Sequence, residues 1–270
     1  MRVLILTSSL NGSASCYLPQ LSELADSYEI VGIVRTCGIS APRSRRRLRK
    51  LQKTARIGVL GAVNGLRIRG WFRPTNTENL EDLCERLSIP FHEEAYTASD
   101  ETRSTFRAMN ADLGLSLGNG YIPPSVYEIP RLGMLNVHTE VLPKYRGAQS
   151  VIWPIYEQDY NTGFTIHQIN KKIDGGRIFY SESRPIKFFS SLQRTVESNL
   201  AETRRRVPLA LADIIRDFDG RAGHTQEGLA RSYTTPSIWQ FRRMVKHNRL
   251  MFRTSQTQED RRIDRTWKKK

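Results

Sequence analysis

Two polar side chains, Asn136 and His138, stand two residues apart where an apolar run ends. The run begins the segment MLNVHTEVLPKYRG, residues 134–147, and predicts a buried strand. Because side chains alternate along a strand, Asn136 and His138 point to the same side. Pro143 and Gly147 follow at once, so the pair lies where a strand opens into a loop. In α/β sheets, ligands bind at that end of a strand.

An amide beside an imidazole suits attack on a carbonyl-like carbon. The Asn136 amide can donate a hydrogen bond to a developing oxyanion, and the His138 imidazole can move or stabilise a proton. Such an imidazole needs a carboxylate to orient and charge it, and Asp174 in the turn IDGG is the candidate. Taken alone, Asn-x-His is also explained by a polar strand end capped by a turn.

Further motifs follow this pair over about forty residues. They are Leu142-Pro143 with Tyr145-Arg146-Gly147, a strand GFTIHQI, and Asp174 in an ID-x-G turn. Together with Asn136 and His138, this ordered set closely resembles the folate-dependent formyltransferase family. That family includes enzymes that formylate glycinamide ribonucleotide, methionyl-tRNA and amino sugars on nucleotides. The resemblance extends more weakly from Met1 to about residue 190.

The resemblance implies transfer of a formyl group from N10-formyltetrahydrofolate to a primary amine, without a metal. His138, held protonated by Asp174, and the Asn136 amide would stabilise the tetrahedral oxyanion. Asp174 would also relay the proton of the amine through water. These three residues are therefore the expected catalytic set.

The resemblance also implies a folate pocket in the loop that follows the apolar run 111–117. Glycines in this loop suit close backbone approach to a flat ring, which Tyr121 or Ile122 would cover. An ordinary Gly/Pro turn explains the same composition. The residues expected to bind the folate are Gly118, Asn119, Gly120, Tyr121, Ile122 and Pro123, with Val141, Leu142, Pro143 and Asp174.

A small-residue loop near the start is expected to face the amine substrate, as it does in the family. Ser8, Ser9, Asn11 and Gly12 could hold a phosphate or sugar at the following helix N-terminus, or form a plain turn. Glu140 stands where many relatives have a small residue after Pro. It is expected either to contact the incoming amine or to face solvent, and His167 is expected to form a wall of the pocket.

The pattern of apolar runs predicts an α/β fold. Runs at 2–7, 28–34, 90–92, 111–117, 134–138, 163–169 and 177–183 predict strands with helices between them. With the resemblance, this predicts a Rossmann-like, mostly parallel sheet flanked by helices over residues 1–190. Residues 191–270 are expected to form a helical extension, with a disordered polar tail from Ser255.

The segment from Arg43 to Arg73 is basic and contains no acidic residue. Its apolar residues recur at spacings of three and four residues, which predicts an amphipathic helix interrupted by Gly58, Gly61 and Gly65. The whole chain carries a net charge of +15, which favours anionic partners. The segment could contact a membrane surface or nucleic acid, close over a substrate phosphate, or be a solvated insertion. Contact with nucleic acid or membrane is possible but not expected.

The substrate expected first is a nucleotide-linked amino sugar, and glycinamide ribonucleotide or another small anionic amine comes second. Residues after 190 are too few for the additional barrel domain of tRNA-formylating relatives. A formyltetrahydrofolate hydrolase, and an RNA- or membrane-binding protein on a relic fold, remain alternatives. Three cysteines without metal-ligand spacing, and no apolar run that would span a bilayer, favour a cytoplasmic protein. A homodimer is possible.

Overall fold

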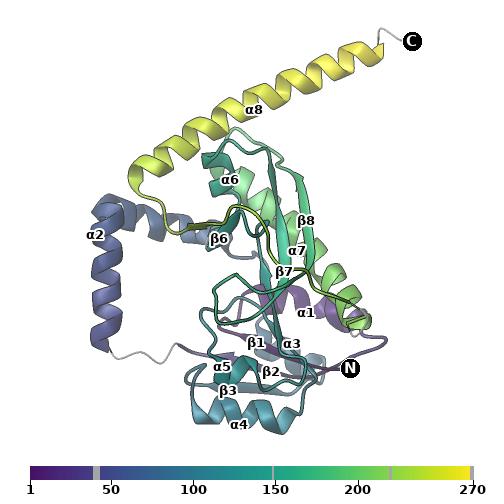
Figure 1. Ribbon diagram of the computed structural model, residues 1–270. Coiled ribbons are helices and arrows are strands. Elements are labelled where there is room, and N and C mark those ends of the chain that lie inside the picture. Colours follow the sequence, from purple (N-terminus) through teal and green to yellow (C-terminus); the bar gives the residue numbers. More distant parts are fainter. Residues whose placement is uncertain (39–42, 148, 219–220, 268–270) are drawn as a thin grey trace.

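The computed structural model describes residues 1–38, 43–147, 149–218 and 221–267. Its centre is a seven-stranded sheet with the order β3-β2-β1-β4-β5-β7-β8 (Figure 1). Five strands are parallel, and β7 and β8 run antiparallel at one edge. The bounds are β1 Arg2–Thr7, β2 Glu29–Thr36, β3 Phe91–Glu94, β4 Leu113–Ser116, β5 Met134–His138, β7 Asn161–Gln168 and β8 Ile178–Pro185. The predicted mostly parallel, Rossmann-like sheet is confirmed.

Helices cover both faces of this sheet, because its central strands are apolar on both sides. In β1, Val3 and Ile5 pack into one cluster while Leu4 and Leu6 pack into another. The first cluster contains residues of three helices, which are α1 Ser13–Glu23, α3 Leu80–Arg86 and α7 Leu192–Arg216. The second contains residues of α4 Asp100–Met109 and α5 Pro124–Tyr127.

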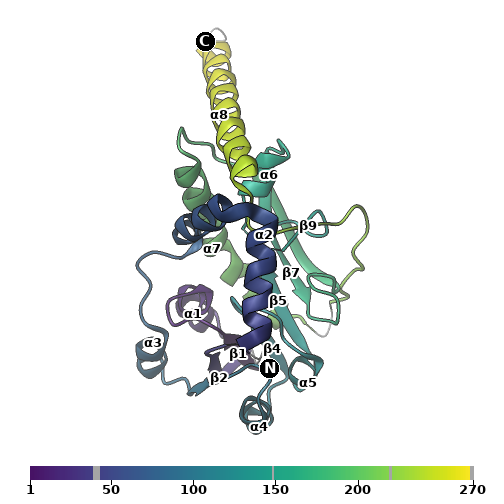
Figure 2. The same cartoon turned by 90° about the vertical axis from the view of Figure 1, so that its left-hand side faces the viewer.

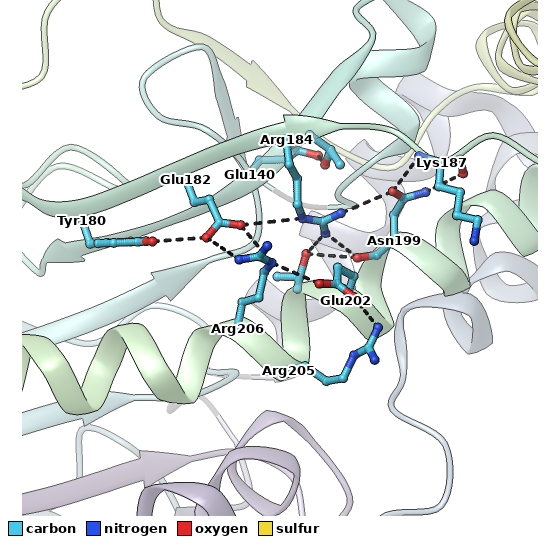
Figure 3. A network of polar contacts seen from close by, with 11 residues as sticks. Glu140, Tyr180, Glu182, Arg184, Lys187, Asn199, Glu202, Arg205 and Arg206 are labelled. Carbon is cyan, nitrogen blue, oxygen red and sulfur yellow. Dashed lines mark hydrogen bonds and ion pairs between the residues drawn. The ribbon is translucent and has the colours of Figure 1, made fainter. Parts of the chain in front are cut away.

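Helix α7, the start of the predicted C-terminal extension, packs on the sheet itself. Polar contacts tie it to β8, as Figure 3 shows. Arg184 of β8 donates to the backbone carbonyl of Asn199 at 2.5 Å, and the Asn199 amide bonds both backbone groups of Lys187. Glu182 of β8 accepts from Arg206 of α7 at 3.4 Å. The core therefore continues past residue 190, and the boundary placed there stays a prediction.

The C-terminal segment returns across the loop that follows β5. Strand β9 Arg231–Tyr233 pairs in parallel with β6 Tyr145–Gly147. Beyond it, α8 Ile238–Trp267 packs its first half against α6 Ile152–Tyr156 and then projects away from the body (Figure 1). The sequence predicts disorder from Ser255, whereas in the structure helix α8 continues through residues 255–267. This stretch holds no Gly or Pro and many good helix formers. Residues 268–270 lie outside the described residues.

The basic segment forms α2 Arg43–Arg67 and a 3₁₀ turn, η1 Ile68–Phe72. The predicted interruption is present at Gly58, where a φ of 73° bends the helix. Figure 2 shows α2 in front of the body with α8 rising beyond it. Over the described ranges, none of the helices combines the length and apolar character needed to cross a membrane.

Candidate active site

The site lies where the parallel part of the sheet meets its antiparallel edge. In the pairing of β5 with β7, Asn136 stands opposite His167 and His138 opposite Thr165. A cavity of about 460 Å³ opens beside this strand end. Asn136, His138, His167 and Asp174 all line it. The structure thus brings the three predicted catalytic residues together with the predicted pocket wall.

The Asp174 carboxylate lies between the two imidazoles. Its Oδ2 is 3.9 Å from Nδ1 of His138, and its Oδ1 is 3.9 Å from Nε2 of His167. The same Oδ2 accepts a hydrogen bond from the Gly147 backbone N–H at 2.9 Å. Asp174 has a φ of 49°, the left-handed conformation that turns its side chain into the cavity mouth. The carboxylate therefore faces a ring nitrogen of each histidine.

His138 is buried and anchored by the main chain. Its Nε2 lies 2.6 Å from the carbonyl oxygen of Tyr145, which can only accept, so Nε2 carries a hydrogen. This bond leaves Nδ1 facing Asp174. A second proton, on Nδ1, would lie between the imidazole and the Asp174 carboxylate. The ring would then be positively charged, as is needed to stabilise negative charge that develops on a substrate.

His167 is held as the neutral imidazole. Its Nδ1–H donates to the Gln168 carbonyl at 2.9 Å, and its Nε2 accepts from the Asn136 amide Nδ2–H at 3.2 Å. Burial lowers the pKa of His167 below its ordinary value, which agrees with this arrangement. One N–H of the Asn136 amide is thereby occupied. The other forms no hydrogen bond with the residues that the structure describes, and it is available to a ligand.

The glycine loop after β4 forms the opposite wall of the cavity. The predicted folate-binding residues that line it are Gly118, Asn119, Gly120, Tyr121 and Ile122. Asn119 fixes the loop by donating to the Leu6 carbonyl at 2.6 Å, and Ile122 is buried below it. Tyr121, 51% exposed, stands at the mouth. Two glycines bring the main chain to this wall, Tyr121 and Ile122 add apolar surface, and the cavity of about 460 Å³ suits a flat, polar-edged ring such as a pterin.

Other predicted folate contacts lie elsewhere. Pro123 is the N-cap of α5, outside the cavity. Leu142 is buried, and its backbone N–H donates to Thr165 Oγ1 at 3.0 Å, which holds the loop against β7. Val141 packs beside Gly163, and Pro143 lines a separate hollow. Residues 141–143 of the loop after β5 thus lie outside the cavity.

The predicted amine-binding loop after β1 lies beside the glycine loop and does not line the cavity. Ser8 Oγ donates to the Gly118 carbonyl at 2.6 Å, and Asn11 donates to the carbonyl of Thr77 at 3.2 Å. Gly12 is packed against Ser9, since a Cβ there would lie 2.9 Å from that side chain. This loop supports the site's walls through its own polar groups.

Glu140 is buried, in contrast to the expectation that it contacts the amine or faces solvent. It is 3% exposed and does not line the main cavity. Its Oε1 accepts from the Val151 N–H at 2.6 Å and from Thr162 Oγ1 at 2.7 Å. Val151 adopts a positive φ of 70°, which turns the chain back over the carboxyl group. Burial raises the pKa of Glu140 to about 7.

A second cavity of about 300 Å³ shares Thr139 with the first. It is lined by Ser13, Tyr17, Arg69, Phe72, Thr139, Gln149, Ser150, Leu200, Thr203 and Arg204. Arg204 is partly buried and donates to the Phe72 carbonyl at 2.9 Å. Among the described residues it forms no ion pair with a carboxylate. A partly desolvated guanidinium beside a cavity favours an anionic ligand.

Two residues of the site carry no signal in the sequence pattern. Gln226 donates to the carbonyls of Asp174 and Gly176 at 2.9 and 2.8 Å, and accepts from Arg146 at 2.6 Å. Tyr233 lines the main cavity, with its ring 4.6 Å from that of Trp153. Both come from the segment before α8. They are brought to the site by the pairing of β9 with β6, which no local periodicity predicts.

The backbone of Gly147 is enclosed by this segment. A Cβ there would lie 2.1 Å from the Tyr233 carbonyl oxygen, and its φ of 97° is one that glycine adopts freely. Its N–H is the group that donates to Asp174. The glycine of the YRG motif therefore joins the Asp174 carboxylate to the returning strand. No group of three or more His, Cys, Asp or Glu arranged to hold a metal occurs in the described part of the chain.

The chain matches one family model and resembles several solved structures in fold. The sequence model described as "Formyl transferase" matches residues 74–209, half of the chain. Glycinamide ribonucleotide transformylase 1 from Symbiobacterium toebii has a similar fold, with a TM-score of 0.55 at 13% identity over 84% of this chain and 94% of that one. A sugar N-formyltransferase from Shewanella sp FDAARGOS_354 has a TM-score of 0.56 at 14% identity, over 92% of this chain and 87% of that one. WlaRD, a sugar 3N-formyl transferase determined with dTDP and 5-N-formyl-THF, has a TM-score of 0.53 at 14% identity, over 86% of this chain and 69% of that one.

Proposed function

The chain belongs to the formyl transferase family and is a formyltransferase, and we propose that it moves the formyl group of N10-formyltetrahydrofolate to a primary amine of an anionic small molecule. The observation that carries the proposal is the convergence of Asn136, His138 and Asp174 on one cavity. The glycine loop 118–122 forms the wall that would receive the folate ring. One similar structure contains a formyl-folate, which supports this donor.

The donor supplies an activated formyl carbon, and the protein supplies orientation and charge. As the amine attacks, negative charge develops on the formyl oxygen. The free N–H of Asn136 would donate to that oxygen. An imidazolium at His138, whose two ring nitrogens face the Tyr145 carbonyl and Asp174, would stabilise the negative charge by its positive charge. Asp174 would hold the imidazolium and accept the proton that the amine loses, directly or through water. As the tetrahedral intermediate collapses, the bond between the formyl carbon and N10 would break, and Asp174 would return that proton to N10 so that tetrahydrofolate leaves.

The second cavity supports an anionic acceptor. Thr139 borders both cavities and directly follows His138, so a molecule in the second cavity could reach the catalytic residues with its amine. Arg204 and the exposed Arg69 would face its anionic group, and Ser13 and Ser150 add hydroxyls. Guanidinium groups recognise phosphate by paired hydrogen bonds.

A nucleotide-linked amino sugar is the acceptor we favour. Such a molecule carries phosphates for the arginines, hydroxyls for the polar wall and a primary amine for the reaction. Two of the similar structures are described as sugar N-formyltransferases, and another as a glycinamide ribonucleotide transformylase. Glycinamide ribonucleotide is therefore the second acceptor to test, and methionyl-tRNA the third.

Release of tetrahydrofolate from N10-formyltetrahydrofolate tests the proposal. The assay compares nucleotide amino sugars, glycinamide ribonucleotide, methionyl-tRNA and no acceptor, for wild type, His138→Ala and the matched control His224→Ala, whose side chain is exposed. We expect turnover with one acceptor, reduced about 10²–10⁴-fold in His138→Ala and unchanged in His224→Ala. Equal turnover without an acceptor would identify a hydrolase. Donor binding without any turnover would contradict the proposal.

A further inference from the structure

The second half of α2 turns its aliphatic side chains to solvent. Val59, Leu60, Val63 and Leu66 are between 59% and 70% exposed. Their positions, i, i+1, i+4 and i+7, form one stripe along a helix. These four residues are the aliphatic face of α2.

Glycines hold the opposite side of the helix against the body. A Cβ on Gly61 would lie 3.2 Å from Ser237 Cα, and one on Gly65 would lie 2.5 Å from Thr235 Cγ2. The chain that enters α8 thus passes directly over these glycines. A surface helix normally buries its apolar stripe. Here the docking of the glycines fixes the aliphatic face outward.

The segment that contains this face is strongly basic in sequence. Residues 43–73 contain eight Lys and Arg between Arg43 and Arg56, and Arg67, Arg69 and Arg73, eleven in all, with no Asp or Glu. The charge comes from residue types alone and needs no particular side-chain placement in the first half of α2. A helix rich in arginine with an exposed aliphatic stripe has the composition of an interfacial helix.

The start of α8 lies next to α2 and carries an exposed aromatic side chain of its own. Trp239 is 71% exposed and follows Ile238, whose backbone nitrogen lies 3.4 Å from a Cβ placed on Gly61. Arg242 stacks over the Trp239 ring at 5.1 Å. Further along, Arg242, Lys246, Arg249 and Arg253 line a hollow of about 560 Å³ together with Phe241, Val245 and Leu250. Figures 1 and 2 both place α2 and the start of α8 side by side.

We propose that the aliphatic face of α2, with Trp239, docks on an anionic lipid bilayer. The aliphatic side chains and the indole would enter the boundary between headgroups and acyl chains, while the cations of α2 and α8 contact headgroup phosphates. A second copy of the chain would bring like charges together across the contact. A nucleic acid would neutralise the charge and leave the aliphatic side chains in water. The inference does not depend on the proposed acceptor.

Flotation of the full chain with vesicles tests the proposal. At about 0.1 M salt we expect binding to phosphatidylcholine vesicles that contain phosphatidylglycerol, and little binding to phosphatidylcholine alone. Binding should shift the tryptophan emission to the blue, and Trp239→Phe should remove most of that shift. About 0.5 M salt should weaken the association, because electrostatic attraction to the surface is screened.

Three variants separate membrane contact from a structural role. Leu60→Asn should weaken vesicle binding roughly tenfold, because one apolar side chain is no longer buried in the bilayer. The double variant Leu60→Asn, Val63→Asn should weaken it further. Leu209→Asn, at an aliphatic residue 50% exposed on α7, should bind as wild type. Equal binding to neutral and anionic vesicles, or no binding to either, would overturn the proposal. So would a dimer that Leu60→Asn converts to monomer, or an RNA complex that Leu60→Asn weakens.

Discussion

Asn136 and His167 face each other across β5 and β7, and the Asn136 amide donates to Nε2 of His167 at 3.2 Å. His167 in turn is fixed as a neutral acceptor by its bond to the Gln168 carbonyl. The orientation of the Asn136 amide, and therefore the direction of its free N–H, is set by a residue on the neighbouring strand. His167 acts in this arrangement as a positioning residue.

Substitution at these two positions should show their dependence. Asn136→Ala should lower kcat by about 10²–10³, the typical cost of one oxyanion donor. His167→Ala should lower kcat less, because the amide remains but rotates. The double variant should be no slower than Asn136→Ala alone, since both changes remove one interaction. Steady-state kinetics at saturating donor checks this, and additive losses would show that His167 acts on its own.

Gln226 should matter through the turn that carries Asp174. Gln226→Ala removes two donors to the carbonyls of Asp174 and Gly176 and the acceptor of Arg146. We expect kcat to fall about tenfold with a small change in KM, because the carboxylate is positioned less well. Glu227→Ala, at the exposed neighbour, is the matched control. A change in KM alone would instead place Gln226 in ligand binding.

Arg204 should determine affinity for the acceptor. Arg204→Met removes the partly buried guanidinium from the second cavity and should raise the acceptor KM about 10–100-fold, the loss of a charged hydrogen bond. Arg205→Met, on the next residue, removes an exposed guanidinium that pairs with Glu202 and should leave KM unchanged. The KM of the donor should be the same in both variants. An unchanged acceptor KM in Arg204→Met would show that the acceptor binds elsewhere.

Glu140 should make stability depend on pH. Its pKa is raised to about 7 in the folded protein, above its ordinary value of 4.5. Between these two values the folded state retains a proton that the unfolded chain releases. The contribution of protonated Glu140 to the free energy of unfolding is therefore fully present below about pH 4.5 and is lost as pH rises towards 7. The difference corresponds to about 3 kcal/mol across that range. Thermal unfolding between pH 5 and 8 checks this.

Glu140→Gln is the matched variant for this prediction. The amide keeps an oxygen for the Val151 and Thr162 donors and cannot ionise. Its unfolding temperature should vary less with pH than that of the wild type. The prediction fails if the two proteins show the same pH dependence of unfolding.

The sheet could be predicted from the sequence because its strands are apolar runs. The run before Asn136 and His138, for example, is a local pattern, and it forms β5 as expected. The side on which the pair points follows from strand alternation alone. The position of Asp174 next to His138 was suggested by the family motif, and the cavity contains both.

Other parts of the site depend on pairings that no local pattern encodes. His167 meets Asn136 through the register of two antiparallel strands, and Tyr233 reaches the cavity because β9 pairs with β6. Glu140 is buried because Val151 folds back over it. In α2, periodicity predicts the helix but not the side that faces solvent. That side is determined by the close approach of Thr235 and Ser237 to two glycines of the helix.

The parallel pairing of β9 with β6 also bears on the order in which the chain becomes active. Tyr233 and Gln226 complete the site, yet they follow almost the whole sheet in the sequence. During synthesis, which proceeds from the N-terminus and allows early segments to fold first, the seven strands of the main sheet can assemble before either residue emerges. The Asp174 carboxylate would then remain loosely held until the returning strand docks, so a nascent chain would have its main sheet before its proposed site is complete.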